Sequence, residues 1–319
     1  MRIETFGVGH VPAARALALA DYDRERRLSP GLPPVLAVPN LREYAENGLG
    51  AAAFEGERMV GFLGCVPPFD NAFRSTDVKG IFSPMGANGA VPENRARIYA
   101  AMYQAAGEKW VKAGAVSHAV CLYAHEEEAQ RQFFCCGFGV RCMDAIRPME
   151  PIPCAPCEEY AYVELPAEEY SLVYPLELAL YQHYRESPFF MNRTPPTEAE
   201  FLTSAREEHA RYFAAVKEGR ICAQLRISSE GETFLSAGSG YRHITGAYCL
   251  PEHRGRGVYP NLLNAAAAVL KAEGYTHLGV DFESINPTAY GFWRKYFSIY
   301  THGLVRRIDE RILCSRQSP

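Results

Sequence analysis

The sequence lacks any long hydrophobic run. No stretch approaches the roughly 18 uncharged apolar residues that a membrane-spanning helix needs. Charged residues already occur between Met1 and Thr5, where a secretory signal peptide would place its apolar segment. We therefore expect a cytoplasmic protein with no membrane partner.

An excess of one charge sign is also missing. The 33 Lys and Arg residues nearly balance the 37 Asp and Glu residues, so the formal net charge is -4 and the pI is near 6.2. A protein that binds a phosphate polymer needs a positive field, which this composition does not supply. The composition predicts no nucleic-acid partner. With 48% hydrophobic and 22% charged residues, it is typical of a folded globular protein.

Paired cysteine clusters at the spacing of a zinc site are absent as well. The single C-x-x-C, from Cys154 to Cys157, has no second pair and lies among prolines. The ten cysteines are otherwise scattered through the chain, often in apolar runs where a thiol behaves as a small hydrophobic group. We predict no metal site and reduced, mostly buried thiols.

The chain is long enough for two domains and repeats a pattern of motifs. The segment Pro92-Glu-Asn-Arg-Ala-Arg97 has a similar counterpart 159 residues later, Pro251-Glu-His-Arg-Gly-Arg256. A proline-rich segment near the middle of the chain is typical of an extended linker. These features predict two copies of one domain. The predicted segments are 1–149, the linker 150–157, and 158–319.

Each copy has a helix, then a hairpin, then a strand, a helix and another strand. This order predicts an α+β fold in which helices flank a mixed sheet with a parallel strand pair at its centre. A helix is expected at 11–27 in the first copy. In the second copy we expect helices at 174–185, 259–273 and 286–296, and strands at 212–216, 220–227, 244–250, 277–282 and 299–307.

A loop with two glycines joins a strand to a helix in the second copy. In Arg254-Gly-Arg-Gly257 the glycines let backbone N–H groups reach a phosphate, the helix N-terminus favours its charge, and two arginines add counter-charge. The loop matches neither the dinucleotide fingerprint nor the nucleoside-triphosphate loop. It is either a phosphate site for another cofactor or a tight turn with solvated arginines.

With a second motif, this loop resembles the GCN5-related N-acetyltransferase (GNAT) family. Residues 251–259 resemble the acyl-CoA motif [QR]-x-x-G-x-[GA], and residues 286–295 resemble N-x-x-A-x-x-[FL]-Y-x-K. The resemblance implies two tandem acyl-CoA N-acyltransferase domains, each with central parallel strands that splay apart. In the N-terminal copy Ala96 and Ile98 are aligned with Gly255 and Gly257, so we expect that copy to be degenerate and to bind no CoA.

The resemblance implies an acyl-CoA-dependent N-acetyltransferase with acetyl-CoA as donor. An amine, on a small molecule or a peptide N-terminus, would attack the thioester directly in the C-terminal copy, in a monomer or homodimer. The pyrophosphate would lie on the amides of residues 255–259 and the thioester carbonyl on those of 248–250. The implied cofactor-binding residues are Tyr248, Cys249, Leu250, Arg254, Gly255, Arg256, Gly257, Val258, Tyr259, Asn286 and Trp293.

Three side chains are candidates for the catalytic base. His243 lies eleven positions before Arg254, where histone-type members of the family carry a carboxylate, and six residues before Cys249, which predicts that both side chains share a face. Asp281 and Glu283 lie near the end of the second central strand, and one of them should face the gap. Plain salt-bridge or surface roles remain open for all three.

Trp293 stands where the family places the tyrosine that protonates the leaving thiolate. An indole N–H donates hydrogen bonds but does not release its proton near neutral pH. This departure favours one alternative, a non-catalytic acyl-CoA-binding or interaction protein with a lapsed active site. The resemblance to duplicated members of the family leaves a second alternative open, in which the paired domains transfer a different acyl or aminoacyl group.

Overall fold

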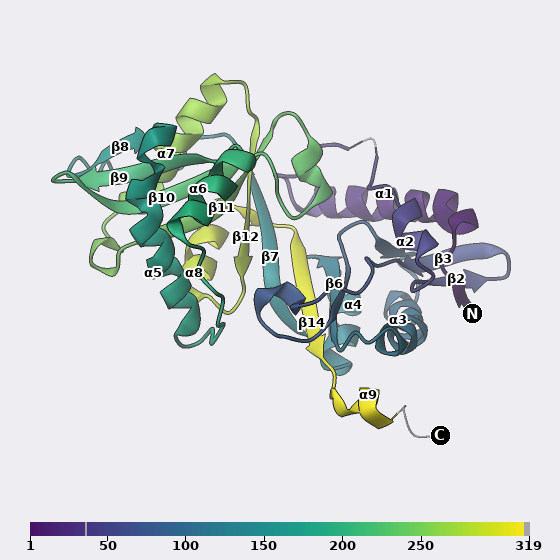
Figure 1. Ribbon diagram of the computed structural model, residues 1–319. Coiled ribbons are helices and arrows are strands. Elements are labelled where there is room, and N and C mark those ends of the chain that lie inside the picture. Colours follow the sequence, from purple (N-terminus) through teal and green to yellow (C-terminus); the bar gives the residue numbers. More distant parts are fainter. Residues whose placement is uncertain (36, 316–319) are drawn as a thin grey trace. The chain divides into compact units, whose positions relative to one another are not determined.

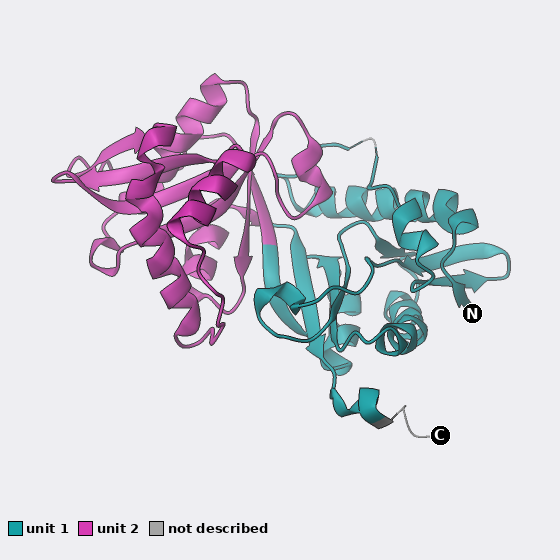
Figure 2. Ribbon diagram, in the orientation of Figure 1, with its two compact units in different colours: residues 1–143, 299–319 teal, residues 144–298 magenta. Residues whose placement is uncertain are grey.

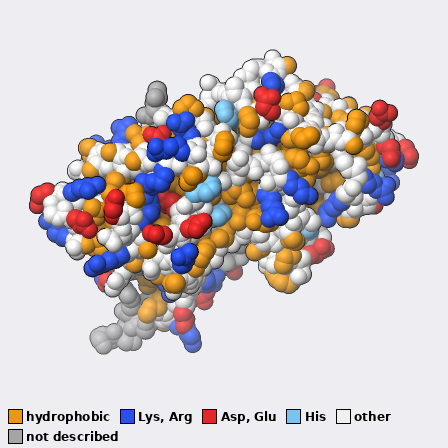
Figure 3. Space-filling view, turned by 180° about the vertical axis from the view of Figure 1, so that it is seen from behind, with side chains coloured by type: hydrophobic (Ala, Val, Ile, Leu, Met, Phe, Trp, Pro, Cys, Tyr) orange, Lys and Arg blue, Asp and Glu red, His pale blue; other side chains and the backbone are white. Residues whose placement is uncertain are grey.

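The computed structural model describes residues 1–35 and 37–315. The chain divides into two compact units, which we describe separately (Figure 2). Unit 1 contains residues 1–143 together with 299–319, and unit 2 contains residues 144–298. Among the described residues, no helix combines the length and the apolar character needed to span a membrane. On the face shown in Figure 3, Lys and Arg side chains are interspersed with Asp and Glu side chains.

Unit 2 is a mixed sheet with helices packed on it (Figure 1). Its strand order is β12-β11-β10-β9-β8, with β11 and β12 parallel and the other neighbours antiparallel. The α+β class is therefore confirmed. The strands are β8 (Ala161–Glu164), β9 (Arg211–Lys217), β10 (Arg220–Ser228), β11 (Tyr241–Cys249) and β12 (His277–Glu283). The helices are α5 (Tyr174–Arg185), α6 (Glu198–Glu207), α7 (Val258–Ala272) and α8 (Pro287–Tyr296).

Local sequence signals account for most of these boundaries. The β9–β10 hairpin turns at Glu218 and Gly219, both with positive φ, as its tight two-residue turn requires. Helix α6 begins at a capping box, in which Thr197 accepts a hydrogen bond from the Glu200 amide and the Glu200 carboxylate bonds back. Helix α7 is followed by Gly274 at a φ of 94°.

The central parallel strands splay apart, as predicted. β11 and β12 pair from Tyr241↔His277 to Ile244↔Val280, and both strands then continue without pairing to each other. Beyond this point β11 continues to pair with β10, up to Ala223↔Cys249. The register along β10 steps from Arg226↔Gly246 to Ile227↔Ile244, so Thr245 is an extra residue in a bulge.

The bulge corrects the prediction that His243 and Cys249 share a face. His243 pairs with Ser228 and Cys249 pairs with Ala223, which are five residues apart on β10 and therefore on opposite faces. The spacing of six residues would have placed both on one face in a regular strand. The extra residue at Thr245 reverses the alternation between them.

Unit 1 contains two sheets. One has the order β1-β2-β3-β5, and the other contains β4-β6-β14-β7. The strands are β1 (Arg2–Thr5), β2 (Ala51–Glu55), β3 (Arg58–Leu63), β4 (Gly80–Ser83), β5 (Asn88–Ala90), β6 (Ser117–Tyr123) and β14 (Thr301–Arg307). The boundary between the units falls within β7 (Gly139–Pro148) and the short β13 (Ser298–Ile299). The helices are α1 (Val11–Leu28), α2 (Arg42–Glu46), α3 (Arg95–Lys112), α4 (Glu127–Cys135) and α9 (Arg311–Ser315).

The last strand lies in unit 1, although the sequence analysis assigned it to the C-terminal copy. β14 pairs antiparallel with β6, from Thr301↔Tyr123 to Arg307↔Ser117, and Leu304 is part of the core that also contains Trp110. This packing places residues 299–319 with unit 1. The predicted limits of the domains and linker remain predictions.

The first copy has a shorter strand-to-helix connection than the alignment assumed. Four residues, 91–94, join β5 to α3, whereas eight, 250–257, join β11 to α7. Ala96 and Ile98 lie within α3 and do not occupy a loop. The turn into α3 is made by Asn94, which adopts the left-handed conformation with φ of 56°. The turn into α3, at residues 91–94, thus contains no glycine.

Candidate functional site

The loop between β11 and α7 has the backbone conformation of an anion-binding turn. Gly255 has a φ of 73° and Gly257, the N-cap of α7, has a φ of 78°. A Cβ on Gly255 would meet nothing within 4 Å, and one on Gly257 would meet only Asn261 Nδ2 at 3.9 Å. Glycine is therefore favoured at both positions by the left-handed backbone and not by crowding.

The same loop presents free hydrogen-bond donors. Among the described residues, none accepts a hydrogen bond from the backbone N–H of Gly255, Arg256 or Gly257. These donors precede the positive end of the α7 dipole. Arg254 is fixed beside them, because its Nε donates to Cys249 O at 2.8 Å and its guanidinium lies 5.3 Å from the Tyr248 ring centroid. The loop can hold a phosphate group.

Two of the predicted cofactor contacts are engaged within unit 2. The Leu250 N–H donates to Cys222 O at 2.9 Å, so it is already paired in this structure. Tyr259, which stands where the family motif has Gly or Ala, is partly buried and donates its hydroxyl to Gln224 O at 2.9 Å. Val258 is also in the core. The Tyr259 ring therefore points away from the phosphate loop and does not crowd it.

The residues of the second motif have structural contacts. Asn286 is the N-cap of α8, and its Oδ1 accepts hydrogen bonds from the amides of Thr288 and Ala289 at 3.2 and 3.1 Å. Trp293 is only 4% exposed and packs edge to face against the ring of Phe297. These contacts do not direct either side chain into the gap between β11 and β12. Their predicted role in cofactor binding remains a prediction.

His243 and Asp281 meet at the point where the central strands part. His243 Nε2 lies 2.8 Å from Asp281 Oδ1, and His243 Nδ1 lies 2.9 Å from the Tyr241 hydroxyl. A Cβ on Gly279 would lie 1.6 Å from that hydroxyl, so the glycine makes room for the tyrosine. The His243 side chain is 1% exposed and the Asp281 side chain 30% exposed. The carboxylate therefore faces solvent with the imidazole behind it.

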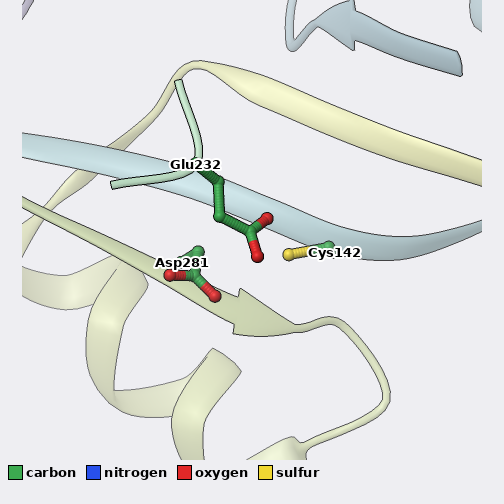
Figure 4. A group of neighbouring side chains, drawn as sticks. All are labelled: Cys142, Glu232 and Asp281. Carbon is green, nitrogen blue, oxygen red and sulfur yellow. The ribbon is translucent and has the colours of Figure 1, made fainter. Parts of the chain in front are cut away.

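Further charged groups lie around Asp281. Glu283 is bonded to Arg193 Nη2 at 2.8 Å, and the Arg193 guanidinium lies 4.9 Å from the Tyr184 ring centroid. A carboxylate oxygen of Glu232 lies within 4.8 Å of one from Asp281, and Figure 4 shows the two side chains directed toward each other. Cys142, also drawn there, belongs to unit 1. Asp281 thus lies in an acidic environment within unit 2.

Cys249, the last residue of β11, has no activated thiol. Burial raises the pKa of Cys249 to about 11, with Arg254 opposing the rise. Because the thiolate is the nucleophilic form, a thiol with this pKa is a poor nucleophile at neutral pH. This pKa favours direct attack by a bound amine over transfer through Cys249.

Sequence reasoning missed Tyr241, Arg193 and Glu232. Tyr241 had a usable signal, because a residue two positions before His243 shares its face in a regular strand. Arg193 and Glu232 lie in irregular segments between elements, where no periodicity predicts which way a side chain points. Only the fold brings them to β12.

In unit 1, charged side chains bond to the backbone at the turn that corresponds to the phosphate loop of unit 2. Asp21 of α1 accepts a hydrogen bond from the Ala90 amide at 3.2 Å, and Arg95 donates to Ala90 O at 2.5 Å. Arg95 also bonds to Asp21 and Glu126, and all three charged side chains are buried. By position along β6 and β12, Cys121 replaces Asp281. Unit 1 thus has an internal ion network in place of a cofactor loop.

Comparison with known proteins finds one family model that matches part of the chain, and several solved structures with a similar fold. Residues 178–298 match the model of the acetyltransferase (GNAT) family, while no curated protein matches the chain. The fold is similar to that of a GCN5-related N-acetyltransferase from Sphaerobacter thermophilus, with a TM-score of 0.58 and 16% identity over 96% of this chain and 95% of that one.

Two further solved structures are similar to this chain. A GCN5-related glucosamine N-acetyltransferase region of a fungal multi-domain β-N-acetylglucosaminidase has a TM-score of 0.50 and 13% identity, covering 95% of this chain and 38% of that one. A tandem GNAT protein from the clavulanic acid biosynthesis pathway has a TM-score of 0.48 and 16% identity, covering 95% of this chain and 97% of that one. At 13% identity, the likeness to the fungal region concerns the fold alone.

Proposed function

Because residues 178–298 match the model of the GNAT acetyltransferase family, we propose that this chain transfers an acetyl group from acetyl-CoA to an amine, with Asp281 as the base. The observation that carries the proposal is the combination, in one unit, of a glycine loop with free amides and a partly exposed carboxylate on the neighbouring splayed strand.

The donor fits the residues of the loop. The amides of residues 255–257 would bind the pyrophosphate of acetyl-CoA, and Arg254 and Arg256 would balance its charge. Acetyl-CoA supplies a thioester whose carbonyl carbon accepts the amine. The left-handed glycines and unpaired N–H groups support this assignment.

In the proposed reaction the amine nitrogen bonds to the carbonyl carbon, the C–S bond breaks, and CoA leaves as a thiol. An alkylammonium acceptor must first lose a proton. We propose that the Asp281 carboxylate is the base that takes this proton. His243 holds that carboxylate in place through the 2.8 Å contact and is itself held by Tyr241. Because His243 is buried, it acts as a positioning residue.

The surroundings of Asp281 favour a cationic acceptor. Glu232 adds a second carboxylate, and negative charge attracts an ammonium group. Both acceptors named in the sequence analysis, a small-molecule amine and a peptide N-terminus, carry such a group. Glu283 already pairs with Arg193, so we give it a structural role at the site.

A second candidate function is acyl-CoA binding without catalysis. The burial of Trp293 favours it, because this indole replaces the family's proton-donating tyrosine and packs into the core. In the catalytic proposal the leaving thiolate takes its proton from water or from another side chain. The two candidates differ in whether free thiol is released.

The decisive experiment follows thiol release from acetyl-CoA with a panel of primary amines, alongside CoA binding by thermal shift. We expect turnover by the wild type, and a decrease in kcat of about 10²- to 10³-fold for Asp281→Asn with CoA binding retained. Asp70→Asn, at an exposed site in unit 1, is the matched control and should change neither readout. CoA binding without turnover would favour the non-catalytic candidate, and loss of both would refute the proposed function.

A further inference from the structure

A buried cluster of unpaired polar atoms lies on β9 and β10. Tyr212 and Arg226 are directly opposite each other, and Gln224 follows two residues along the same face of β10. Four of their side-chain atoms are buried without a hydrogen-bond partner among the described residues. These atoms are Tyr212 Oη, Arg226 Nε, Gln224 Oε1 and Gln224 Nε2.

These unpaired atoms are costly because the side chains that carry them are buried. Tyr212 and Gln224 are both 0% exposed. A buried donor or acceptor without a partner costs about 1–3 kcal/mol, and native proteins contain few of them. Three neighbouring residues that share this deficit indicate that a polar group binds against them.

The cluster adjoins the point where the central strands part. Arg226 pairs with Gly246 of β11, and a Cβ on Gly246 would lie 3.9 Å from Gln224 Nε2. Gly246 directly follows the bulge at Thr245, whose Oγ1 is also buried and unpaired among the described residues. A ligand group bound to Gln224 beside Gly246 would therefore lie over β11, the neighbour of β12, which carries Asp281.

The charges around the cluster select the kind of group that fits. Arg226 Nη2 pairs with Glu208 at 2.9 Å, so its positive charge is already balanced. Glu177 of α5 lies near both Arg226 and Tyr212, and burial raises its pKa while Arg226 opposes the rise. The unpaired atoms include donors and acceptors in nearly equal supply. A neutral group with both capacities matches them better than an ion does.

We propose that Gln224, Tyr212 and Arg226 form a subsite for a neutral amide or hydroxyl group, carried by the acceptor a few carbons from its reacting amine. This inference rests on the proposed function and specifies its acceptor class. Arg226 and Glu177 are only partly buried, so the group enters from their side. An acceptor without such a group leaves the buried atoms unpaired and binds more weakly.

The test compares two amines of equal chain length, 4-aminobutanamide and pentylamine. Gln224→Leu and Tyr212→Phe should each lower kcat/KM for 4-aminobutanamide about tenfold and leave that for pentylamine unchanged. Tyr212→Phe removes one atom and keeps the packing of the ring. Gln182→Leu, on the exposed face of α5, is the matched control and should alter neither amine.

Calorimetry with 4-aminobutanamide and CoA separates this inference from the proposed function. If neither amine is acetylated, the proposed function fails, and binding alone decides the subsite. Binding to the wild type that is lost in Gln224→Leu supports it. Two results overturn it: no binding to the wild type, or a fall in the unfolding temperature of both variants with unchanged preference between the amines, which would mean that the cluster holds structural water only.

Discussion

At the residue scale, His243 illustrates how burial decides between two roles that the sequence could not separate. An imidazole at the surface could itself remove a proton, but this one is 1% exposed and contacts Asp281 on one side and Tyr241 on the other. A hydrogen bond to the charged form of a carboxylate stabilises that form. The imidazole therefore acts on the proposed reaction through Asp281.

We predict that His243→Asn lowers kcat by about tenfold, less than the loss expected for removing the base. Because the imidazole positions the carboxylate and does not touch the acceptor, kcat should fall while the KM for the acceptor changes little. Steady-state kinetics with the acetylated amine test this split between kcat and KM, which lost packing alone would not produce. Tyr241→Phe, which keeps the ring, should give a smaller decrease in kcat. An unchanged kcat in His243→Asn, or a rise in KM in place of the fall in kcat, would contradict this role.

His118 of β6 gives a second prediction at this scale, on stability. Burial lowers its pKa to about 4, with a smaller contribution from Arg306 and an opposing hydrogen bond to Ala115 O. In the unfolded chain a histidine titrates near 6.5. Between these values the unfolded state binds more protons, so stability is complete above pH 6.5 and is lost as the pH falls toward 4.

Urea unfolding of the wild type and of His118→Gln at pH 7, 5.5 and 4.5 checks this. The wild type should lose free energy of unfolding over this range, by up to about 3 kcal/mol for this group. The variant should start less stable at pH 7, because it disturbs the contact with Tyr103, and should lose less on acidification. Equal pH dependence in both proteins would rule out His118 as the source.

At the scale of elements, the glycine at the start of α7 determines whether the loop can present its amides. A side chain in the left-handed conformation costs roughly 1–2 kcal/mol, and asparagine tolerates it best among residues with a Cβ. Asn94 adopts this conformation in the equivalent turn before α3, so the chain itself shows that asparagine is tolerated at such a position. We expect Gly257→Val to abolish the thermal shift caused by CoA, and Gly257→Asn to retain the fold and a reduced shift.

Thermal denaturation with and without CoA measures both variants. Wild-type protein at 100 times its Kd for CoA should gain about 2.7 kcal/mol. Both variants must unfold cooperatively without CoA for the comparison to hold. Full CoA affinity in Gly257→Val would exclude this loop as the phosphate site.

The limits of the helices were largely predictable from the sequence, whereas the register in which the strands pair was not. Helix α5 was predicted at its observed limits, and α7 within one residue, because apolar periodicity and the proline and glycine at its ends are local signals. The bulge at Thr245 depends on pairing with β10, which no local pattern encodes. It alone decides that His243, and not Cys249, shares a face with Asp281.

At the scale of the whole molecule, the two copies differ in what fills the strand-to-helix turn. Unit 2 leaves amides free at a left-handed glycine loop, whereas unit 1 satisfies the Ala90 amide and carbonyl with Asp21 and Arg95. The sequence predicted this asymmetry from the missing glycines, although it misplaced Ala96 and Ile98. It gave no sign of the compensating ions, because Asp21 lies far from Arg95 along the chain.

The last strand, β14, is a second difference between the two units. β14 continues the chain from unit 2 but lies between β6 and β7 in unit 1, where Tyr300, Thr301 and Leu304 are fully buried. The apolar pattern of residues 299–307 predicted a strand but carried no information on its partner. Strand partners are set by packing across the sheet, which a single sequence does not display.

We predict one CoA site per chain. Titration calorimetry with the full chain should give a stoichiometry of one, because a phosphate would have to displace the buried Asp21 carboxylate from the Ala90 amide in unit 1 and would still meet no glycine loop. Gly257→Val should then remove all the binding heat. Asp21→Asn supplies the control: it weakens the ion network with Arg95, which lowers the stability of unit 1, yet it should create no second site because the four-residue turn at 91–94 remains. A stoichiometry of two in the wild type, or residual CoA binding in Gly257→Val that disappears on adding a substitution in unit 1, would show that the N-terminal copy retains a cofactor site.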